Sequence, residues 1–208
     1  MDIARVCEMQ EANPLHALYR CYGTILEMLQ DRGYETGEKL DVLGFFGVLK
    51  NPNYKLVYSK KADPNWNLQV FFVRQATNSD SPNLGKKDIE TYKKIMEKNK
   101  VRAAVLVLMN IDVTSYARKE IETLKPTYWI ECFGVNKLQI NITRHEKTPR
   151  HQLLTEAETK EFLQKHSLKL DAIPKISQVD PVALYFAAQP GQVFRIDKET
   201  YVAHRVVV

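Results

Sequence analysis

Histidine and cysteine, the usual ligands of zinc and frequent catalytic side chains, are few in this sequence and widely spaced. Neither a metal-binding HExxH nor a CxxC pattern occurs, so no zinc site is predicted. The GxGxxG, GxxxxGK[ST] and GxSxG patterns that hold phosphates or present a catalytic serine are also missing. We therefore expect no metal and no cofactor. The 208 residues include five histidines and three cysteines, namely His16, His145, His151, His166 and His204 with Cys7, Cys21 and Cys132.

A magnesium-dependent nuclease is the one enzymatic alternative that these residues leave open. Its site needs an Asp on one strand and a Glu and a Lys two residues apart on the next, so that carboxylates hold Mg²⁺ and the lysine orients water. The strand expected after Asp63 carries Val73–Gln75 where the carboxylate and lysine are required. Glu158 and Lys160 have the spacing, but they fall on an expected helix of another module. We expect no catalytic activity, with a metal-dependent nuclease as the alternative.

Composition indicates an ordinary globular protein with a mild basic excess. Hydrophobic residues make up 44% and charged residues 26% of the chain, and the net charge is +5. These values exclude disordered and collagen-like classes. No apolar run approaches the ~18 residues of a membrane helix, and no signal-peptide pattern opens the sequence. We expect a soluble intracellular protein that can touch nucleic acid but is not a tight autonomous DNA binder.

Apolar spacing and turn residues predict an α/β layer up to Thr143. Asn13 and Pro14 are a favourable helix cap and first turn, and Gly33 is a favourable left-handed end. The apolar run Ala103–Met109 indicates a strand covered on both faces, as parallel strands are. The expected order is helix 14–33, helix 38–50, strand 55–59, turn 63–65, strand 68–73, loop 75–84, helix 86–98, strand 103–109, helix 115–124, and strands 127–133 and 137–143 around Gly134.

A polar, proline-containing stretch at 144–151 indicates a domain boundary, which divides the chain into 1–143 and 144–208. Beyond it, Thr155 and Glu158 form a predicted capping box that begins a helix to about residue 166. Asp180 followed by Pro181 predicts a second helix start. Two short strands, 192–196 and 201–208, close the sequence. The expected fold class is an α/β domain followed by a small α+β module.

The junction of the two modules carries a longer pattern, His145–His151 followed by Glu158. It resembles the signature of the fifth subunit shared by the nuclear DNA-directed RNA polymerases, whose C-terminal module is similar to a small component of the archaeal RNA polymerase. Lys147-Thr148, Ala157 and the short hairpin Asp197–Tyr201 depart from the family pattern and indicate a divergent or paralogous member. Further matches follow in order at Asp31–Tyr34, Val70–Phe72, Leu138–Ile142, Leu170–Ile176, Asp180–Tyr185, Gly191–Ile196 and Glu199–Val206.

The resemblance implies a non-catalytic structural subunit of a multisubunit polymerase. It implies a nuclease-like α/β jaw domain over 1–143 that lacks the metal site, and an α+β assembly domain over 144–208. The assembly domain would dock on the largest polymerase subunit, beside neighbouring subunits, and the jaw would contact downstream duplex DNA during transcription. The implied location is the nucleus, or the compartment of a virus-encoded polymerase, with no membrane. A free-standing adaptor that borrows the assembly module is a further alternative.

The resemblance places the DNA contact at a strand-to-helix corner. The residues that match it are Thr114, Ser115, Tyr116, Ala117 and Arg118. A Thr or Ser cap leaves helix N–H groups and a partial positive charge facing a phosphate. Arg118 can add a contact without base preference. The family's proline is missing here, and Tyr116 replaces a small residue.

The resemblance also implies a subunit interface within the C-terminal module. Large apolar groups in so small a module are candidates for interface anchors, although core packing is the alternative reading for Leu184 and Val193. The implied interface residues are His145, Pro149, His151, Asp180, Pro181, Tyr185, Gly191, Gln192, Val193 and Arg205.

Overall fold

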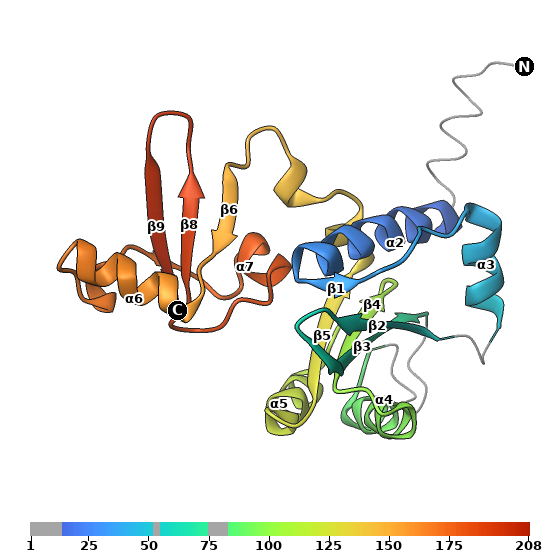
Figure 1. The fold of residues 1–208 in the computed structure, drawn as a ribbon. Helices are drawn as coiled ribbons and strands as arrows, with labels where there is room; N and C mark the ends of the chain where they lie inside the picture. The colour runs from blue at the N-terminus through green and yellow to red at the C-terminus, as the bar shows by residue number, and fades with distance from the viewer. Residues whose placement is uncertain (1–13, 52–54, 75–82) are drawn as a thin grey trace, which may run out of the picture. The chain divides into compact units, whose positions relative to one another are not determined.

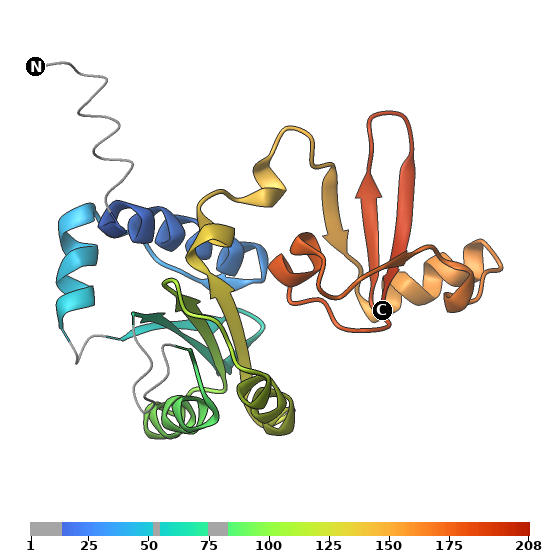
Figure 2. The same ribbon diagram turned by 180° about the vertical axis from the view of Figure 1, so that it is seen from behind.

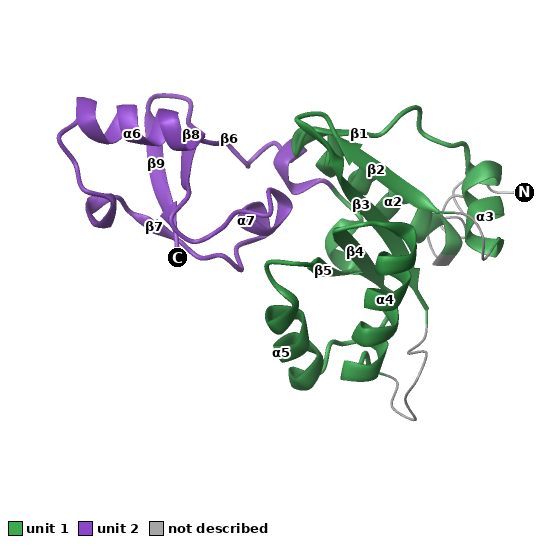
Figure 3. Cartoon of the chain, turned by 60° about the horizontal axis from the view of Figure 1, so that its bottom comes forward, with its two compact units in different colours: residues 1–140 green, residues 141–208 purple. Residues whose placement is uncertain are grey.

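The structure, a computed structural model, describes residues 14–51, 55–74 and 83–208. These residues form two compact units, 1–140 and 141–208 (Figure 3). Each unit has its own sheet and its own apolar core. The expected cap Asn13 and most of the expected loop 75–84 lie outside the described residues. Among the described residues, no helix has the length and apolar content needed to cross a membrane.

The first unit is built on a five-stranded mixed sheet in the order β1-β2-β3-β4-β5. β1, β2 and β3 pair antiparallel, whereas β3, β4 and β5 pair parallel. All six residues of β4 are buried, as its continuous apolar sequence predicts. The strands are β1 (Tyr34–Glu35), β2 (Leu56–Lys60), β3 (Asp63–Val73), β4 (Ala103–Leu108) and β5 (Trp129–Gly134).

Helices cover both faces of this sheet, with α2 and α3 on one side and α4 and α5 on the other (Figures 1 and 2). The alternation of side chains along β3 explains this arrangement. Phe72 packs edge-on against Phe45 of α3, with ring centroids 5.3 Å apart, while Phe71 meets Tyr92 of α4 at 5.1 Å. The helices are α2 (Pro14–Asp31), α3 (Val42–Lys50), α4 (Lys86–Asn99) and α5 (Ser115–Leu124).

The predicted helices 14–33, 86–98 and 115–124 are confirmed, and the helix expected over 38–50 is shorter. Gly33 has the left-handed φ of 83° expected after α2. α3 begins only at Val42, because the carboxylate of Asp41 accepts the Gly44 N–H at 2.8 Å and caps the helix there.

The turn predicted at 63–65 is wrong by two residues. β3 begins at Asp63, and the turn lies at Lys61 and Ala62. The register shifts at Ser59 and Lys60, so that Ser59 pairs with Asn67 and Lys60 pairs with Asp63. The extra residues on β3 form a bulge, which accommodates a proline inside a strand.

The strand predicted over 137–143 is also wrong. Two short 3-10 helices replace it, η1 (Val135–Leu138) and η2 (Ile142–Arg144). The carboxamide of Gln139 donates to the Ala17 carbonyl of α2 at 3.1 Å, and Asn141 accepts the Thr143 N–H at 2.9 Å. These side-chain bonds favour turns over a strand ladder.

The second unit contains a four-stranded sheet in the order β6-β8-β9-β7, in which only β9 and β7 pair parallel. Its first strand, β6, was not predicted; it begins in the stretch 144–151 expected to be a domain boundary and continues to Leu153. The capping box is confirmed, since Thr155 accepts the Glu158 N–H at 3.2 Å and Glu158 accepts the Thr155 N–H at 2.8 Å. The elements are β6 (Arg150–Leu153), α6 (Glu156–Lys165), η3 (Leu170–Ala172), β7 (Lys175–Ile176), α7 (Pro181–Tyr185), β8 (Val193–Asp197) and β9 (Val202–Val207).

Candidate functional site

The corner between β4 and α5 is held in place by Thr114. Its hydroxyl accepts the Ala117 N–H at 3.2 Å and donates to the carbonyl of Leu84 at 3.0 Å. The Thr114 N–H also donates to the Leu84 carbonyl, at 3.1 Å. A parallel bridge joins Leu84 to Val113, so the corner is tied to the segment that leads into α4. The predicted cap is therefore confirmed, and it fixes where α5 begins.

The corner presents its polar side chains to solvent. Ser115 and Arg118 are exposed, and Tyr116 is 74% exposed. The Arg118 guanidinium donates through Nε to the Val113 carbonyl at 3.3 Å, which holds its charge beside the start of the helix. Ala117 is fully buried, so its side chain packs in the core and cannot reach a ligand.

Two helix N-termini lie at this edge of the sheet, and they differ in charge. At α4, the buried carboxylate of Asp88 accepts the Gly85 N–H at 2.8 Å and so occupies the helix start. The first turn of α5 contains no acidic residue. The partial positive charge of the α5 terminus is therefore open to an external anion, whereas that of α4 is already balanced by Asp88.

The lysine at the start of α4 is tied into ion pairs. Lys86 Nζ lies 3.1 Å from Glu120 Oε2 of α5 and 3.9 Å from Glu90 Oε1. The hydrogen bond and the negative charge of Glu120 raise the pKa of Lys86. Its charge is therefore partly compensated within the protein, which leaves Arg118 as the basic group best placed to bind an anion at the corner.

The residues considered for a nuclease site lie far apart. Asp63 begins β3 and Arg74 follows its end, so about ten strand residues, or roughly 33 Å, separate them. Glu158 is engaged in the capping box, where hydrogen bonds from Thr155 lower its pKa. Among the residues that the structure describes, no group of three or more His, Cys, Asp or Glu side chains could hold a metal ion.

Two of the implied interface residues are buried inside the second unit, so their side chains cannot reach a partner. Tyr185 is 4% exposed, and its hydroxyl accepts a hydrogen bond from the Asn141 amide at 3.1 Å. Val193 is fully buried and packs with Ile173 and Val206. For Val193 the structure therefore favours core packing over an interface anchor.

Several other implied interface residues shape the loops of this unit. Asp180 accepts the Val182 N–H at 2.9 Å and caps α7. His151 Nδ1 lies 2.7 Å from the Pro149 carbonyl, and Gly191 has a left-handed φ of 88° that favours glycine. Gln192 accepts the Gln189 N–H at 2.7 Å.

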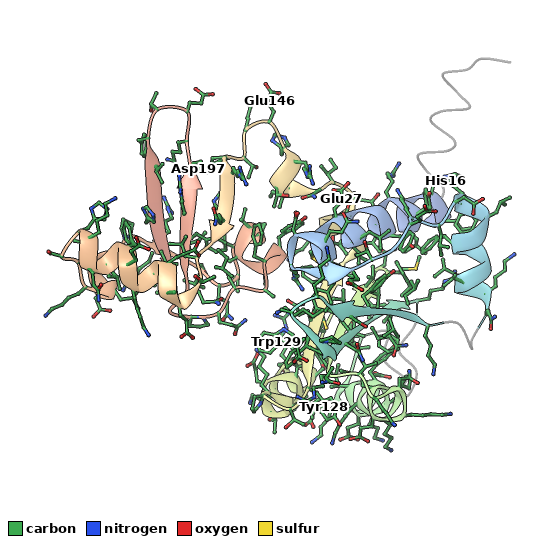
Figure 4. The ribbon with its side chains drawn as sticks, viewed as in Figure 1. His16, Glu27, Tyr128, Trp129, Glu146 and Asp197 are labelled. Atoms are coloured by element: carbon green, nitrogen blue, oxygen red, sulfur yellow. The ribbon has the colours of Figure 1, made fainter. Side chains whose placement is uncertain are left out.

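Four of the implied interface residues are exposed to solvent. They are His145, Pro181, Gly191 and Arg205. His145 lies beside the exposed Glu146, which is labelled at the loop before β6 in Figure 4. Arg205 makes one long hydrogen bond, at 3.5 Å, to the Lys175 carbonyl. The accessible part of the implied interface thus has two polar side chains, those of His145 and the basic Arg205.

A buried ion pair in the first unit was not predicted from the sequence. Arg32 donates to both oxygens of Glu131, at 2.6 and 3.2 Å, and the two side chains are only 6% and 13% exposed. It joins the end of α2 to β5. The available signal was Glu131 itself, a charged residue among the apolar residues of an expected strand.

Comparison with known proteins finds RNA polymerase subunits among the relatives of this chain. A family model described as RNA polymerase Rpb5, C-terminal domain, matches residues 140–208. A Caenorhabditis elegans protein named DNA-directed RNA polymerases I, II, and III subunit RPABC1 is 31% identical, and the match covers 93% of this chain and 96% of the relative. The Caenorhabditis briggsae protein of the same name is 30% identical with the same coverage. DNA-directed RNA polymerase V subunit 5A of Arabidopsis thaliana is 27% identical, over 92% of this chain and 88% of that protein.

Proposed function

This chain belongs to the Rpb5 family of DNA-directed RNA polymerase subunits, and from that membership we propose that it is a non-catalytic structural subunit of a nuclear multisubunit polymerase. The observation that carries the proposal is the likeness to the Caenorhabditis elegans subunit over 93% of this chain. Worm, slime mould and plant relatives support the nuclear location. Nucleotide addition would then belong to other subunits.

We assign the jaw to residues 1–143 and the assembly domain to residues 144–208. The division of the chain into units 1–140 and 141–208 supports this assignment to within three residues. The match of the Rpb5 C-terminal domain model to residues 140–208 supports treating the second unit as a separate module. In this proposal the exposed residues His145, Pro181 and Arg205 contact the largest polymerase subunit.

The jaw contacts downstream duplex DNA through the α5 corner. Three observations support this: the exposed hydroxyl of Ser115, the helix start without an acidic residue, and the exposed guanidinium of Arg118. Such contacts reach phosphates and read no sequence. Tyr116 adds an exposed aromatic ring that can lie against the DNA backbone.

Duplex binding by the purified chain tests the corner. We expect a dissociation constant of roughly 10⁻⁴ to 10⁻⁶ M that weakens steeply with salt. Arg118→Glu should weaken binding and reduce the salt slope by about 1. The matched control is Arg102→Glu, since Arg102 is also exposed but precedes β4, at the opposite end of that strand from the corner. An equal effect of both substitutions would contradict the assignment of the corner.

A further inference from the structure

A groove of about 630 Å³ opens in the first unit between α3, β3 and α4. Its volume lies within the range of about 300 to 1,000 Å³ that is typical of ligand sites. Val48, Leu49, Phe71 and Ile95 supply apolar lining, and Lys55 and Lys98 stand at its border. All of the described residues that line this groove belong to the first unit, and none of them belongs to the α5 corner.

The groove lies at the end of β3, beyond its described pairing with β2. β2 starts at Leu56, which pairs with Val70, whereas β3 continues to Val73. Within the described residues, no strand lies along this flank of β3 beyond Val70. α3 and α4 lie on opposite sides of the sheet (Figure 1), and both contribute residues to the lining of the groove.

The polar wall of the groove is held in one arrangement by paired side-chain amides. Asn99 at the end of α4 donates through Nδ2 to Gln69 Oε1 at 2.9 Å. Gln69 is only 4% exposed. This bond joins the end of α4 to β3 and so holds the α4 side of the groove in place beside Lys98.

The charge of the groove has one sign. Among the described residues that line it, none is acidic. Lys55 and Lys98 are exposed, and neither forms an ion pair with any residue in the described part of the chain. Other lysines of the same helix are paired, since Lys93 lies 3.6 Å from Glu97 and Lys86 lies 3.1 Å from Glu120. The two groove lysines are therefore available to an external anion.

From this charge complementarity we propose that the groove binds a short acidic, apolar segment of a partner protein. Leucine or aromatic side chains of the segment bury against Leu49, Phe71 and Ile95, which are only partly buried in the chain itself. Its carboxylates pair with Lys55 and Lys98. Apolar burial supplies affinity, while the lysines select acidic segments over basic ones.

Fluorescence anisotropy with the full chain tests the proposal. The probe is a fluorescein-labelled peptide of about ten residues in which Asp alternates with Phe and Leu. We expect saturable binding that weakens as salt rises from about 0.05 to about 0.3 M. Lys98→Glu and Lys55→Glu should each weaken it about fivefold or more, and Leu49→Gln should weaken it without changing the salt dependence.

Lys94→Glu is the matched control, because Lys94 is an exposed lysine of α4 that does not line the groove. It should leave probe affinity within about twofold of the unaltered chain. Equal losses from Lys94→Glu and Lys98→Glu, or equal binding of the same peptide with Lys in place of Asp, would overturn the proposal. Thermal unfolding of each variant shows that it is folded. Because the readout is peptide binding, it is independent of the duplex contact at Arg118.

Discussion

The ion pair of Arg32 with Glu131 places two charges in the interior of the first unit. With side chains only 6% and 13% exposed, either partner left alone would keep a charge away from water. Glu131→Ala should therefore lower the free energy of unfolding by about 3 to 5 kcal/mol. Urea denaturation measures this loss.

A double substitution shows whether the cost of removing the two charges from water or the attraction between them is larger. Replacing both partners, as Arg32→Met with Glu131→Leu, removes both buried charges and should restore most of the stability lost by Glu131→Ala. If the double variant were less stable than Glu131→Ala, attraction within the pair would outweigh the cost of removing the two charges from water.

His204 should make the stability of the second unit depend on pH. Its ring stacks on Phe162 with centroids 3.9 Å apart. Burial, followed by the charges of Arg195 and His166, lowers the pKa of His204, and Asp197 opposes the shift. Since the folded pKa lies below the unfolded value of about 6.5, the unfolded chain binds the proton more tightly.

The contribution of His204 is therefore fully present above about pH 6.5 and is lost as the pH falls through the lowered folded pKa. His204→Phe keeps a ring on Phe162 but removes the titration. Measuring the free energy of unfolding of the unaltered chain and of the His204→Phe variant at about pH 7.5 and pH 5.5 isolates this effect. Parallel pH profiles would show that His204 is not responsible.

Among the elements, the start of α5 can be strengthened by proline. Ser115 is the first helical residue, where a missing N–H costs little, and Thr114 before it has φ −65° and ψ 156°, a conformation that a following proline favours. Ser115→Pro should raise the free energy of unfolding by about 0.5 to 1 kcal/mol. Thermal unfolding measures it. Lys119→Pro, inside the same helix, should instead cost about 3 kcal/mol or more.

The same element shows what local sequence can predict. α5 has the predicted bounds because Thr114 caps it and Pro126, two residues beyond its last residue, stops it. The capping box of α6 is equally local. Fold class could likewise be predicted, because the apolar β4 requires cover on both faces.

The failed strand over 137–143 shows what pattern alone does not decide. Its alternating apolar and polar residues fit a strand, yet Leu138 is 3% exposed and Ile140 is 71% exposed. The segment turns because Gln139 bonds to α2, a partner more than 100 positions away in sequence. β6 was not predicted, because it has only four residues and one of them, Arg150, is charged and exposed, as is common in a connecting segment.

Some features of the candidate site could also be predicted from local sequence, and others could not. The cap and exposure of the α5 corner follow from local sequence, but the burial of Ala117, Tyr185 and Val193 depends on packing against distant segments. The groove at β3 could not be predicted, because it depends on where β2 begins relative to the longer β3.

At the scale of the whole molecule, the two proposed domains have different functions. A single substitution should therefore impair polymerase assembly or DNA binding without impairing the other. The tagged full chain, captured from its native extract, should recover the two largest polymerase subunits in equal amount. Arg205→Glu should reduce that recovery, because it reverses an exposed charge of the proposed assembly surface. Arg118→Glu should leave recovery unchanged while weakening duplex binding. Quantitative mass spectrometry of the captured material measures recovery, and the duplex-binding assay measures the second effect.

The control for this capture is Lys160→Glu, since Lys160 is exposed on α6 and belongs to neither proposed surface. It should retain both polymerase recovery and duplex binding. Loss of recovery with Arg118→Glu as large as with Arg205→Glu would contradict the division of tasks, because the two residues belong to different compact units. Capture of the unaltered chain without either large subunit would contradict assembly itself, whereas duplex binding would still test the corner independently.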